Sequence, residues 1–256
     1  MAHVEPLPGE PAAVADLDGE RALVVADYHA GIEAALRGEG VEIDSRANER
    51  RDHLLALLDR TDPDRLVVLG DLAHHIGEPG GAEREELRGL LAAVPDRVSV
   101  LIVKGNHDGE IEGAIDGDVG VTVAVTDPSG VHIGEVGFAH GHTWPAPAVL
   151  RADAVCVGHE HPQVRLEDAV GGRRVERAWL RGDLVPGAFE GHVGEDGTAG
   201  IDGELVVFPA FSGIPGGTWA NVEGQSFLSP FLPEGLADGQ AYLLDGTRLG
   251  EYRRVS

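Results

Sequence analysis

Five short apolar runs in this 256-residue chain end in side chains that can bind a metal ion. In chain order these ends carry Asp27 and His29; Asp71; Asn106, His107 and Asp108; His140 and His142; and His159 and His161. A single histidine after a strand is usually an ordinary polar residue, but five separate runs with this ending are hard to assign to chance. Carboxylate, amide and imidazole groups together favour manganese, iron, zinc or nickel over magnesium or calcium. The pattern therefore predicts a metal site built where strands end.

The first half of the chain repeats the order strand, polar loop, helix. Strands are predicted at 21–26, 65–69 and 98–103, helices at 45–60 and 82–93, and a short helix or loop at 31–40. Repeats of this kind predict parallel strands joined by right-handed crossovers, whose C-terminal ends share one edge of a sheet. That edge is where α/β folds place their ligands.

The second half of the chain, beyond Asp116, changes to short alternating apolar runs, which predict antiparallel strands and hairpins. These strands are expected at 119–125, 131–139, 154–157, 164–169 and 175–180, and two further strands are expected at 205–211 and 241–244. The Gly- and acid-rich segment 189–203 predicts a mobile surface loop.

The spacing of the candidate ligands bears on the number of ions. In an extended segment, residues i and i+2 point to the same side, so Asp-x-His and His-x-His pairs could each grip one ion. Two such pairs, together with Asp71 and Asn106, exceed the roughly four ligands that one zinc ion needs. The count suits two ions about 3.5–4 Å apart that share one carboxylate.

The charge of the chain limits its partners. It has 44 Asp and Glu against 20 Lys and Arg, which gives a net charge of −24, and Lys104 is the only lysine. Because the acids are spread along the whole length, we expect a halophilic protein whose surface repulsion is screened by salt. Such a surface repels nucleic-acid phosphates at low salt, although a narrow metal site could still accept one.

The remaining composition predicts one cytoplasmic domain over residues 1–256. Cys156 is the only cysteine, which excludes a disulfide framework and fits a reducing compartment. No segment approaches the length of a membrane span, and residues 1–19 lack the pattern of a signal peptide. We therefore expect no membrane partner.

The motifs, taken in order, resemble the five signature motifs of the calcineurin-like metallophosphoesterases. They are Asp27-x-His29, Gly70-Asp71, Gly105-Asn106-His107-Asp108, His140-Gly141-His142 and Gly158-His159-x-His161. Residues 23–33 and 208–211, with Gly216-Gly217, are similar to an archaeal branch related to double-strand-break-repair nucleases and ligase-associated phosphoesterases. One departure from that branch is Ala73, where a lysine is expected before His74.

The resemblance implies an α/β fold, a four-layer αββα sandwich of two mixed sheets with a dinuclear metal site at the strand ends. It places on the first metal Asp27, His29 and His161, between the metals Asp71, and on the second metal Asn106, His140 and His159. His107 would face the phosphate as a general acid or a stabilising cation, and Asp108 would orient it or hold its proton. His142, His74 and His75 are expected to be neighbours of the site.

The implied activity is metal-dependent hydrolysis of a phosphoester, with a phosphodiester as the preferred substrate and a metal-bridging hydroxide as the nucleophile. Two divalent ions are expected, manganese first, with iron, zinc or nickel as alternatives, and no organic cofactor. A phosphomonoesterase or nucleotide phosphatase could use the same site. A non-catalytic metal-binding scaffold and a nuclease-related subunit are further alternatives, and the net charge of −24 opposes the last. The sequence leaves the oligomeric state open.

Residues outside these motifs receive ordinary interpretations. Glu160 is expected to be a solvated residue between two ligands, and Cys156 a packing residue. The guanidinium groups of Arg151, Arg165 and Arg181 could bind a phosphate oxygen, although scattered arginines usually lie on the surface.

Overall fold

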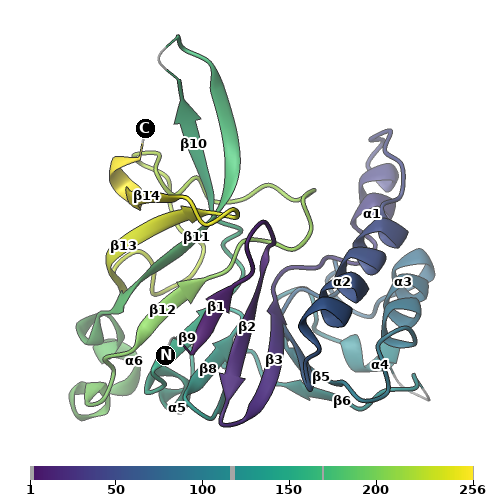
Figure 1. Cartoon of the computed structure of the whole chain (residues 1–256), viewed down its shortest axis with the longest axis horizontal. Coiled ribbons are helices and arrows are strands. Elements are labelled where there is room, and N and C mark those ends of the chain that lie inside the picture. Colours follow the sequence, from purple (N-terminus) through teal and green to yellow (C-terminus); the bar gives the residue numbers. More distant parts are fainter. Residues whose placement is uncertain (1–2, 116–118, 169, 256) are drawn as a thin grey trace.

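The computed structural model describes residues 3–115, 119–168 and 170–255 of the chain, in which two mixed β-sheets face each other (Figure 1). The first sheet contains, in spatial order, β1 (Val4–Pro6), β2 (Ala12–Leu17), β3 (Glu20–Val25), β4 (Arg65–Leu69), β5 (Ser99–Val103) and β6 (Val123–Thr126). Strands β3 to β6 are parallel, and for β3, β4 and β5 this confirms the prediction made for 21–26, 65–69 and 98–103. The antiparallel arrangement predicted for 119–125 is wrong, because β6 continues the parallel series beside β5.

The second sheet has the order β14-β13-β11-β12-β9-β8-β7, and β10 pairs with β11 off this path. Its strands are β7 (Val131–Ile133), β8 (Val136–Ala139), β9 (Ala154–Val157), β10 (Gln163–Glu167), β11 (Arg173–Leu184), β12 (Glu204–Val207), β13 (Leu236–Leu243) and β14 (Arg248–Glu251). Here too the antiparallel prediction is partly wrong, since β8, β9 and β12 are parallel neighbours. The strand predicted at 164–169 begins one residue earlier, and its last residue, Ala169, lies outside the described residues.

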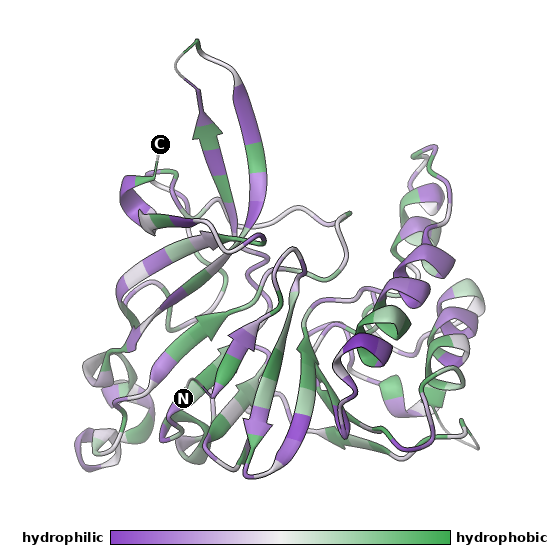
Figure 2. Ribbon diagram, viewed as in Figure 1, coloured by the Kyte–Doolittle hydropathy of each residue, from purple (hydrophilic) through white to green (hydrophobic). Residues whose placement is uncertain are grey.

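Buried side chains form three cores that define four layers. One core fills the space between the sheets and includes Val24, Leu69, Phe138 and Cys156. A second core lies between the first sheet and its helices, and a third covers the opposite face of the second sheet. The strands carry most of the apolar residues, and polar residues colour the outer helix faces (Figure 2). The predicted αββα sandwich is therefore confirmed.

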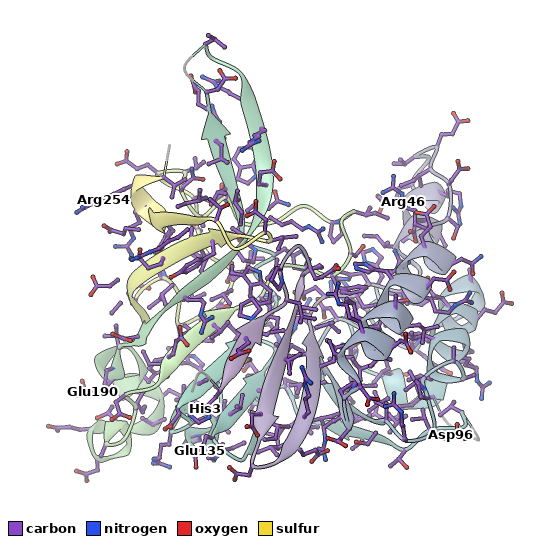
Figure 3. All side chains as sticks on the ribbon, in the orientation of Figure 1. His3, Arg46, Asp96, Glu135, Glu190 and Arg254 are labelled. Carbon is purple, nitrogen blue, oxygen red and sulfur yellow. The ribbon has the colours of Figure 1, made fainter. Side chains whose placement is uncertain are left out.

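Six α-helices lie among the described residues, and the two longest overlap the predicted helical segments 45–60 and 82–93. They are α1 (Ile32–Gly38), α2 (Ala47–Thr61), α3 (Gly81–Leu91), α4 (Ile111–Ile115), α5 (Pro147–Leu150) and α6 (Glu190–Val193). Leu54, Leu57 and Leu58 of α2 are buried, and this helix ends at Thr61, followed by the left-handed Asp62 and by Pro63. Charged side chains project outward around the molecule, among them Asp96, Glu135 and Glu190 (Figure 3). Among the described residues no helix is long and apolar enough to cross a membrane.

The segment 189–203 is more ordered than the loop predicted for it. It follows the 3-10 helix η1 (Pro186–Phe189) and contains α6 and the 3-10 helix η2 (Glu195–Thr198). Phe189 is fully buried against the rings of Trp144 and Phe231, at centroid distances of 6.0 and 5.7 Å. The many glycines and acids of this segment gave no sign of helical structure in the sequence. The burial of the single aromatic residue Phe189 shows only in the structure.

Candidate metal centre

All five predicted motifs follow the C-terminal ends of parallel strands. Three of them follow β3, β4 and β5 in the first sheet, and two follow β8 and β9 in the second. Because the two sheets pack face to face, their loops meet at one end of the sandwich. The arrangement brings the predicted ligands together from both sheets.

The backbone is left-handed at five of the seven predicted ligands. The φ angles are 56° at Asp27, 53° at His29, 50° at Asp71, 69° at His159 and 44° at His161. Side-chain-bearing residues rarely adopt this conformation, and such strain gathers at functional sites. The Asp-x-His pair is therefore not extended, as its spacing predicted, and its side chains converge because the loop turns sharply at both residues.

The first cluster consists of Asp27, His29 and His161. The Nε2 atoms of the two histidines are 3.3 Å apart, and Nε2 of His161 lies 3.3 Å from Oδ1 of Asp27. Candidate ligand atoms from all three residues lie within 4.8 Å of one another. Asp27 is fully buried, and the backbone N–H of His159 donates to its carboxylate at 3.1 Å.

The second cluster consists of Asp71, His140 and His159, whose candidate ligand atoms also lie within 4.8 Å of one another. Nε2 of His140 lies 3.4 Å from Oδ2 of Asp71 and 3.2 Å from Oδ1 of Asn106. The amide oxygen of Asn106 therefore lies beside this cluster.

Asp71 lies between the two clusters. Its Oδ2 atom is 3.9 Å from Nε2 of His29 and 3.4 Å from Nε2 of His140, while Oδ1 accepts a hydrogen bond from the backbone N–H of His107 at 3.0 Å. One oxygen therefore faces both clusters, and the other holds the loop that follows β5. Two glycines make this approach possible, because a Cβ at Gly105 would collide with Oδ1 of Asp71, and one at Gly70 with the ring of His140.

Backbone carbonyl groups fix the orientation of two ligand rings. Nδ1 of His140 donates to the carbonyl of Leu69 at 2.7 Å, and Nδ1 of His161 donates to that of Gly216 at 2.9 Å. This assignment leaves the lone pair of each Nε2 turned toward the carboxylates, which is how metal-binding histidines are held in proteins.

The electrostatics of the clusters suit a cation. Burial lowers the pKa of His29 to about 3 and that of His159 to about 4, so both imidazoles are neutral and able to bind a metal. Burial alone would also lower the pKa of His140, but Asp71 and Asp27 raise it to about 9. The carboxylates therefore strongly favour positive charge at this position. The donor types, tautomers and field of the described residues all fit divalent metal ions.

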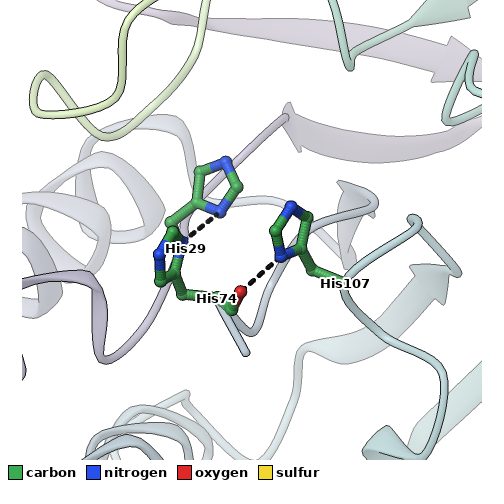
Figure 4. Close-up of side chains that lie close together, drawn as sticks. All are labelled: His29, His74 and His107. Carbon is green, nitrogen blue, oxygen red and sulfur yellow. Dashed lines mark hydrogen bonds between the residues drawn. The ribbon is translucent and has the colours of Figure 1, made fainter. Parts of the chain in front are cut away.

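His107 lies beside the clusters without belonging to the two groups that contain carboxylates. Its Nδ1 donates to the carbonyl oxygen of His74 (Figure 4), and its Nε2 is 3.9 Å from Oδ2 of Asp71. The His74 ring stacks on the His107 ring with centroids 5.4 Å apart. Nδ1 of His74 lies 3.3 Å from Nδ1 of His29. These three histidines also form a group with ligand atoms within 4.8 Å.

The sequence interpretation expected Asp108 to orient the His107 ring. The structure shows instead that the Asp108 carboxylate bonds to backbone groups. Its buried carboxylate accepts hydrogen bonds from the backbone N–H groups of Leu72, Ala73 and Gly105, at 3.3, 3.0 and 2.9 Å. Burial, followed by the charge of Asp71, raises its pKa to about 6. An aspartate in a tight turn readily bonds to nearby backbone groups, so this carboxylate ties together the loops after β4 and β5.

His142 and His75, which were also predicted to be neighbours of the site, lie at different distances from the clusters. The ring of His142 lies 5.2 Å from that of His140 and 5.9 Å from that of His159, and its buried Nδ1 has no hydrogen-bond partner among the described residues. His75 is exposed, and its backbone N–H donates to Oε1 of Glu83 at 2.8 Å. Only His142 of these two faces the clusters.

Glu160 is the residue that the sequence interpretation most clearly missed. It was expected to be solvated, but it is fully buried and accepts hydrogen bonds from the Thr218 hydroxyl and the backbone N–H groups of Leu228 and Ser229. It thereby fixes a C-terminal loop to the turn that carries His159 and His161. Because its partners are 58 to 69 residues away, no local pattern could have revealed this role.

A second C-terminal stretch wraps the first cluster. The N–H groups of Phe211 and Ser212 donate to the carbonyl groups of Ala26 and Asp27, at 2.8 and 3.2 Å. The Phe211 ring stacks on that of Tyr28 with centroids 5.8 Å apart. The sequence marked this stretch only through its resemblance to a known branch.

The part of the chain that contains the five motifs also matches a protein-family model. Residues 20–163 match the model described as calcineurin-like phosphoesterase. The chain belongs to this family. It is therefore a metallophosphoesterase, a hydrolase that acts on phosphate-ester bonds. The matched segment contains all seven predicted ligands and His107.

Two solved structures resemble this phosphoesterase. The nuclease MPE of Pseudomonas putida aligns over 96% of this chain and 100% of its own, with a TM-score of 0.56 and 20% identity, which supports the fold alone. Yfce, a phosphoesterase from E. coli, aligns over 58% of this chain and 74% of its own, with a TM-score of 0.35 and 22% identity. The comparison with curated proteins found no match.

Proposed function

We propose that this phosphoesterase hydrolyses phosphodiesters at a site that holds two divalent transition-metal ions, manganese being the first candidate. The observation that carries the proposal is the position of Asp71, whose Oδ2 faces His29 of one cluster and His140 of the other. One shared carboxylate between two ligand sets is the arrangement expected for a pair of ions. The name of the Pseudomonas putida neighbour, a nuclease, is compatible with a diester substrate.

Each ion would be held by its own set of side chains. The first would take Asp27, His29 and His161, the second Asn106, His140 and His159, and both would take Asp71. When bound, two such ions supply a hydroxide nucleophile at neutral pH and neutralise charge on the phosphoryl oxygens. The residues of this chain hold the ligand rings in place and bury the carboxylates away from water.

His107 would act on the substrate from beside the ions. Because its Nδ1–H is donated to the carbonyl of His74, its Nε2 is the atom available for the reaction. Nε2 would protonate the departing ester oxygen, or as part of a cationic ring it would stabilise the phosphoryl charge. Asp108 would support this role indirectly, by fixing the loop on which His107 lies.

A substrate comparison on metal-reconstituted protein tests the proposal. The protein is stripped with a chelator, reloaded with manganese, zinc, iron or nickel in separate samples, and assayed with bis(4-nitrophenyl) phosphate and 4-nitrophenyl phosphate. We expect faster turnover of the diester. Preference for the monoester would instead indicate a phosphomonoesterase, and metal binding without turnover of any phosphoester would indicate a non-catalytic scaffold.

A further inference from the structure

Two hollows in the surface meet beside the first cluster. One has a volume of about 260 Å³ and is lined by the predicted ligand His161. The other, of about 240 Å³, is lined by Arg46, which lies beside the start of α2 (Figure 3). Arg177 and Ser212 line both hollows. The two together form a cleft that leads from the metal ligands toward α2.

Arg177 differs from the other arginines of its strand. The remaining arginines of β11 form ion pairs with glutamates, namely Arg173 with Glu167, Arg174 with Glu176, and Arg181 with Glu204. Arg177 has no carboxylate at ion-pair distance among the described residues. Its Nη1 donates to the carbonyl groups of Ala210 and Phe211, at 2.8 and 3.2 Å, so Nε and Nη2 are left without partners there.

The charge of Arg177 is poorly compensated by its surroundings. Burial lowers its pKa, and the more distant Glu10 and Glu176 oppose that effect. Both acids have other partners, since Glu176 lies 3.6 Å from Arg174 and Glu10 lies 2.6 Å from Nε2 of His53. A half-buried guanidinium with a free edge is a strong donor to an anion.

Ser212 supplies an independent sign of a ligand at the same place. The residue is 3% exposed, and its Oγ has no hydrogen-bond partner among the described residues. Its backbone N–H donates to the carbonyl of Asp27 at 3.2 Å, which sets it directly beside the first cluster. Buried hydroxyl groups almost always have a partner, so this unpaired Oγ, in a residue that lines the cleft, would pair with a polar group that enters deeply enough to reach it.

We propose that Arg177 and Ser212 form an anion subsite, which binds a second phosphate group of the substrate while the metal clusters hold the ester to be cleaved. Arg46 lies at the far end of the same cleft, whose lining also includes the acids Glu49 and Glu176, so Arg177 is the cation nearest the metal ligands. The inference rests on the proposed phosphodiesterase function. It narrows the substrate class to phosphodiesters that carry a further phosphate.

Equilibrium binding tests the subsite without relying on catalysis. Thymidine 3′,5′-bisphosphate and thymidine 5′-phosphate differ by one phosphate group, and calorimetry on metal-loaded protein at one KCl concentration measures the affinity of each. We expect the bisphosphate to bind more tightly, on the order of ten- to a hundredfold. Arg177→Met, which keeps the bulk and removes the charge, should abolish this advantage, and Arg177→Lys should keep part of it.

Matched variants make the outcome decisive. Arg173→Met removes an arginine of the same strand at the exposed end of the hairpin and should keep the full advantage. Ser212→Ala, which loses one hydroxyl, should reduce the advantage severalfold and serves if Arg177→Met does not fold. Equal binding of the two nucleotides by the wild type, or an advantage that survives both substitutions in the cleft, would overturn the subsite.

Turnover separates this inference from the proposed function. The 5′-(4-nitrophenyl) esters of the same two nucleotides are assayed with the wild-type protein. Faster hydrolysis of the ester that carries the 3′-phosphate supports both proposals. A tighter-binding bisphosphate without hydrolysis of either ester would reject the phosphodiesterase and leave the anion subsite standing.

Discussion

The His107 side chain can be tested apart from metal binding, because its Nδ1 is held by the His74 carbonyl and its Nε2 faces the site. If Nε2 protonates the leaving oxygen, His107→Asn should slow hydrolysis of an alkyl ester by on the order of 10²–10⁴-fold. A nitrophenyl ester, which departs without a proton, should lose much less activity. Rates on the two esters and the metal content of the variant check this prediction.

Other outcomes for His107→Asn have distinct meanings. Similar slowing of both esters would show that the ring stabilises the phosphoryl charge, which is common to both reactions. Loss of metal together with both activities would show that His107 is itself a ligand. Either result contradicts the role of general acid.

Asp71 is the residue on which the two-ion proposal depends. In Asp71→Asn the side chain keeps its shape but loses the charge that faces His29 and His140, so both ions should bind more weakly and activity should collapse. Metal analysis after gel filtration measures the loss. Asp18→Asn is a matched control, because Asp18 is an exposed aspartate that is also left-handed, with φ at 57°. Two tightly bound ions and near-normal turnover in Asp71→Asn would refute the shared carboxylate.

Local sequence predicted which side chains meet but not how the backbone brings them there. Asp27 and His159 could be found because each follows an apolar run, and the ends of parallel strands share an edge. The left-handed angles and the hydrogen bond between these two residues depend on loops from two different sheets. Arg177 was missed for a similar reason, since its lack of an ion pair shows only after its neighbours are placed.

The helices beside the site are joined by a buried charge network. Arg50 of α2 donates to Glu33 of α1 at 2.9 Å and to Glu86 of α3 at 2.6 Å, and all three side chains are at most 5% exposed. Glu86 also accepts a hydrogen bond from the N–H of Gly31, two residues after His29. The network therefore connects the packing of three helices to the first metal loop.

Removing the cation from this network should be costly. Arg50→Ala leaves Glu33 and Glu86 buried without their partner, and we expect it to lower the free energy of unfolding by about 3–5 kcal/mol. Urea denaturation in high salt measures the change. Arg51→Ala is the control, because the pair between Arg51 and Asp52 is exposed and should be worth about 0–1 kcal/mol. Equal effects of the two substitutions would contradict the importance of the network.

Strand direction was predictable only where a long helix with clear apolar periodicity separates the strands. The parallel order of β3, β4 and β5 follows from the helices α2 and α3 between them, whereas β8 and β9, which are joined through the four-residue helix α5, were assigned to hairpins. Ala154–Val157 is apolar and buried at every position, which is typical of a parallel strand with both faces covered. The neighbouring strand β12 follows β9 in the chain only after the long β10–β11 hairpin. The sequence between them therefore does not indicate that β12 pairs with β9 in parallel.

The whole molecule carries far more acid than its ion pairs can neutralise. With 44 Asp and Glu and only 20 Lys and Arg, the acids outnumber these cations by 24. Charged side chains project from every outer layer of the sandwich (Figure 3). The exposed acids therefore repel one another across the surface, and this repulsion favours the unfolded chain, in which the same charges lie farther apart.

Salt should relieve this repulsion in the folded state. Screening shortens the reach of the surface charges from about 30 Å at 0.01 M salt to about 3 Å at 1 M. The melting temperature should therefore climb as KCl is raised from millimolar to molar concentration, in metal-loaded and in chelated protein alike. Thermal denaturation followed by circular dichroism measures the curve. If only the metal-loaded protein responds, salt acts through the metal site, and if the curve is flat or falls, the acidic surface is not an adaptation to salt.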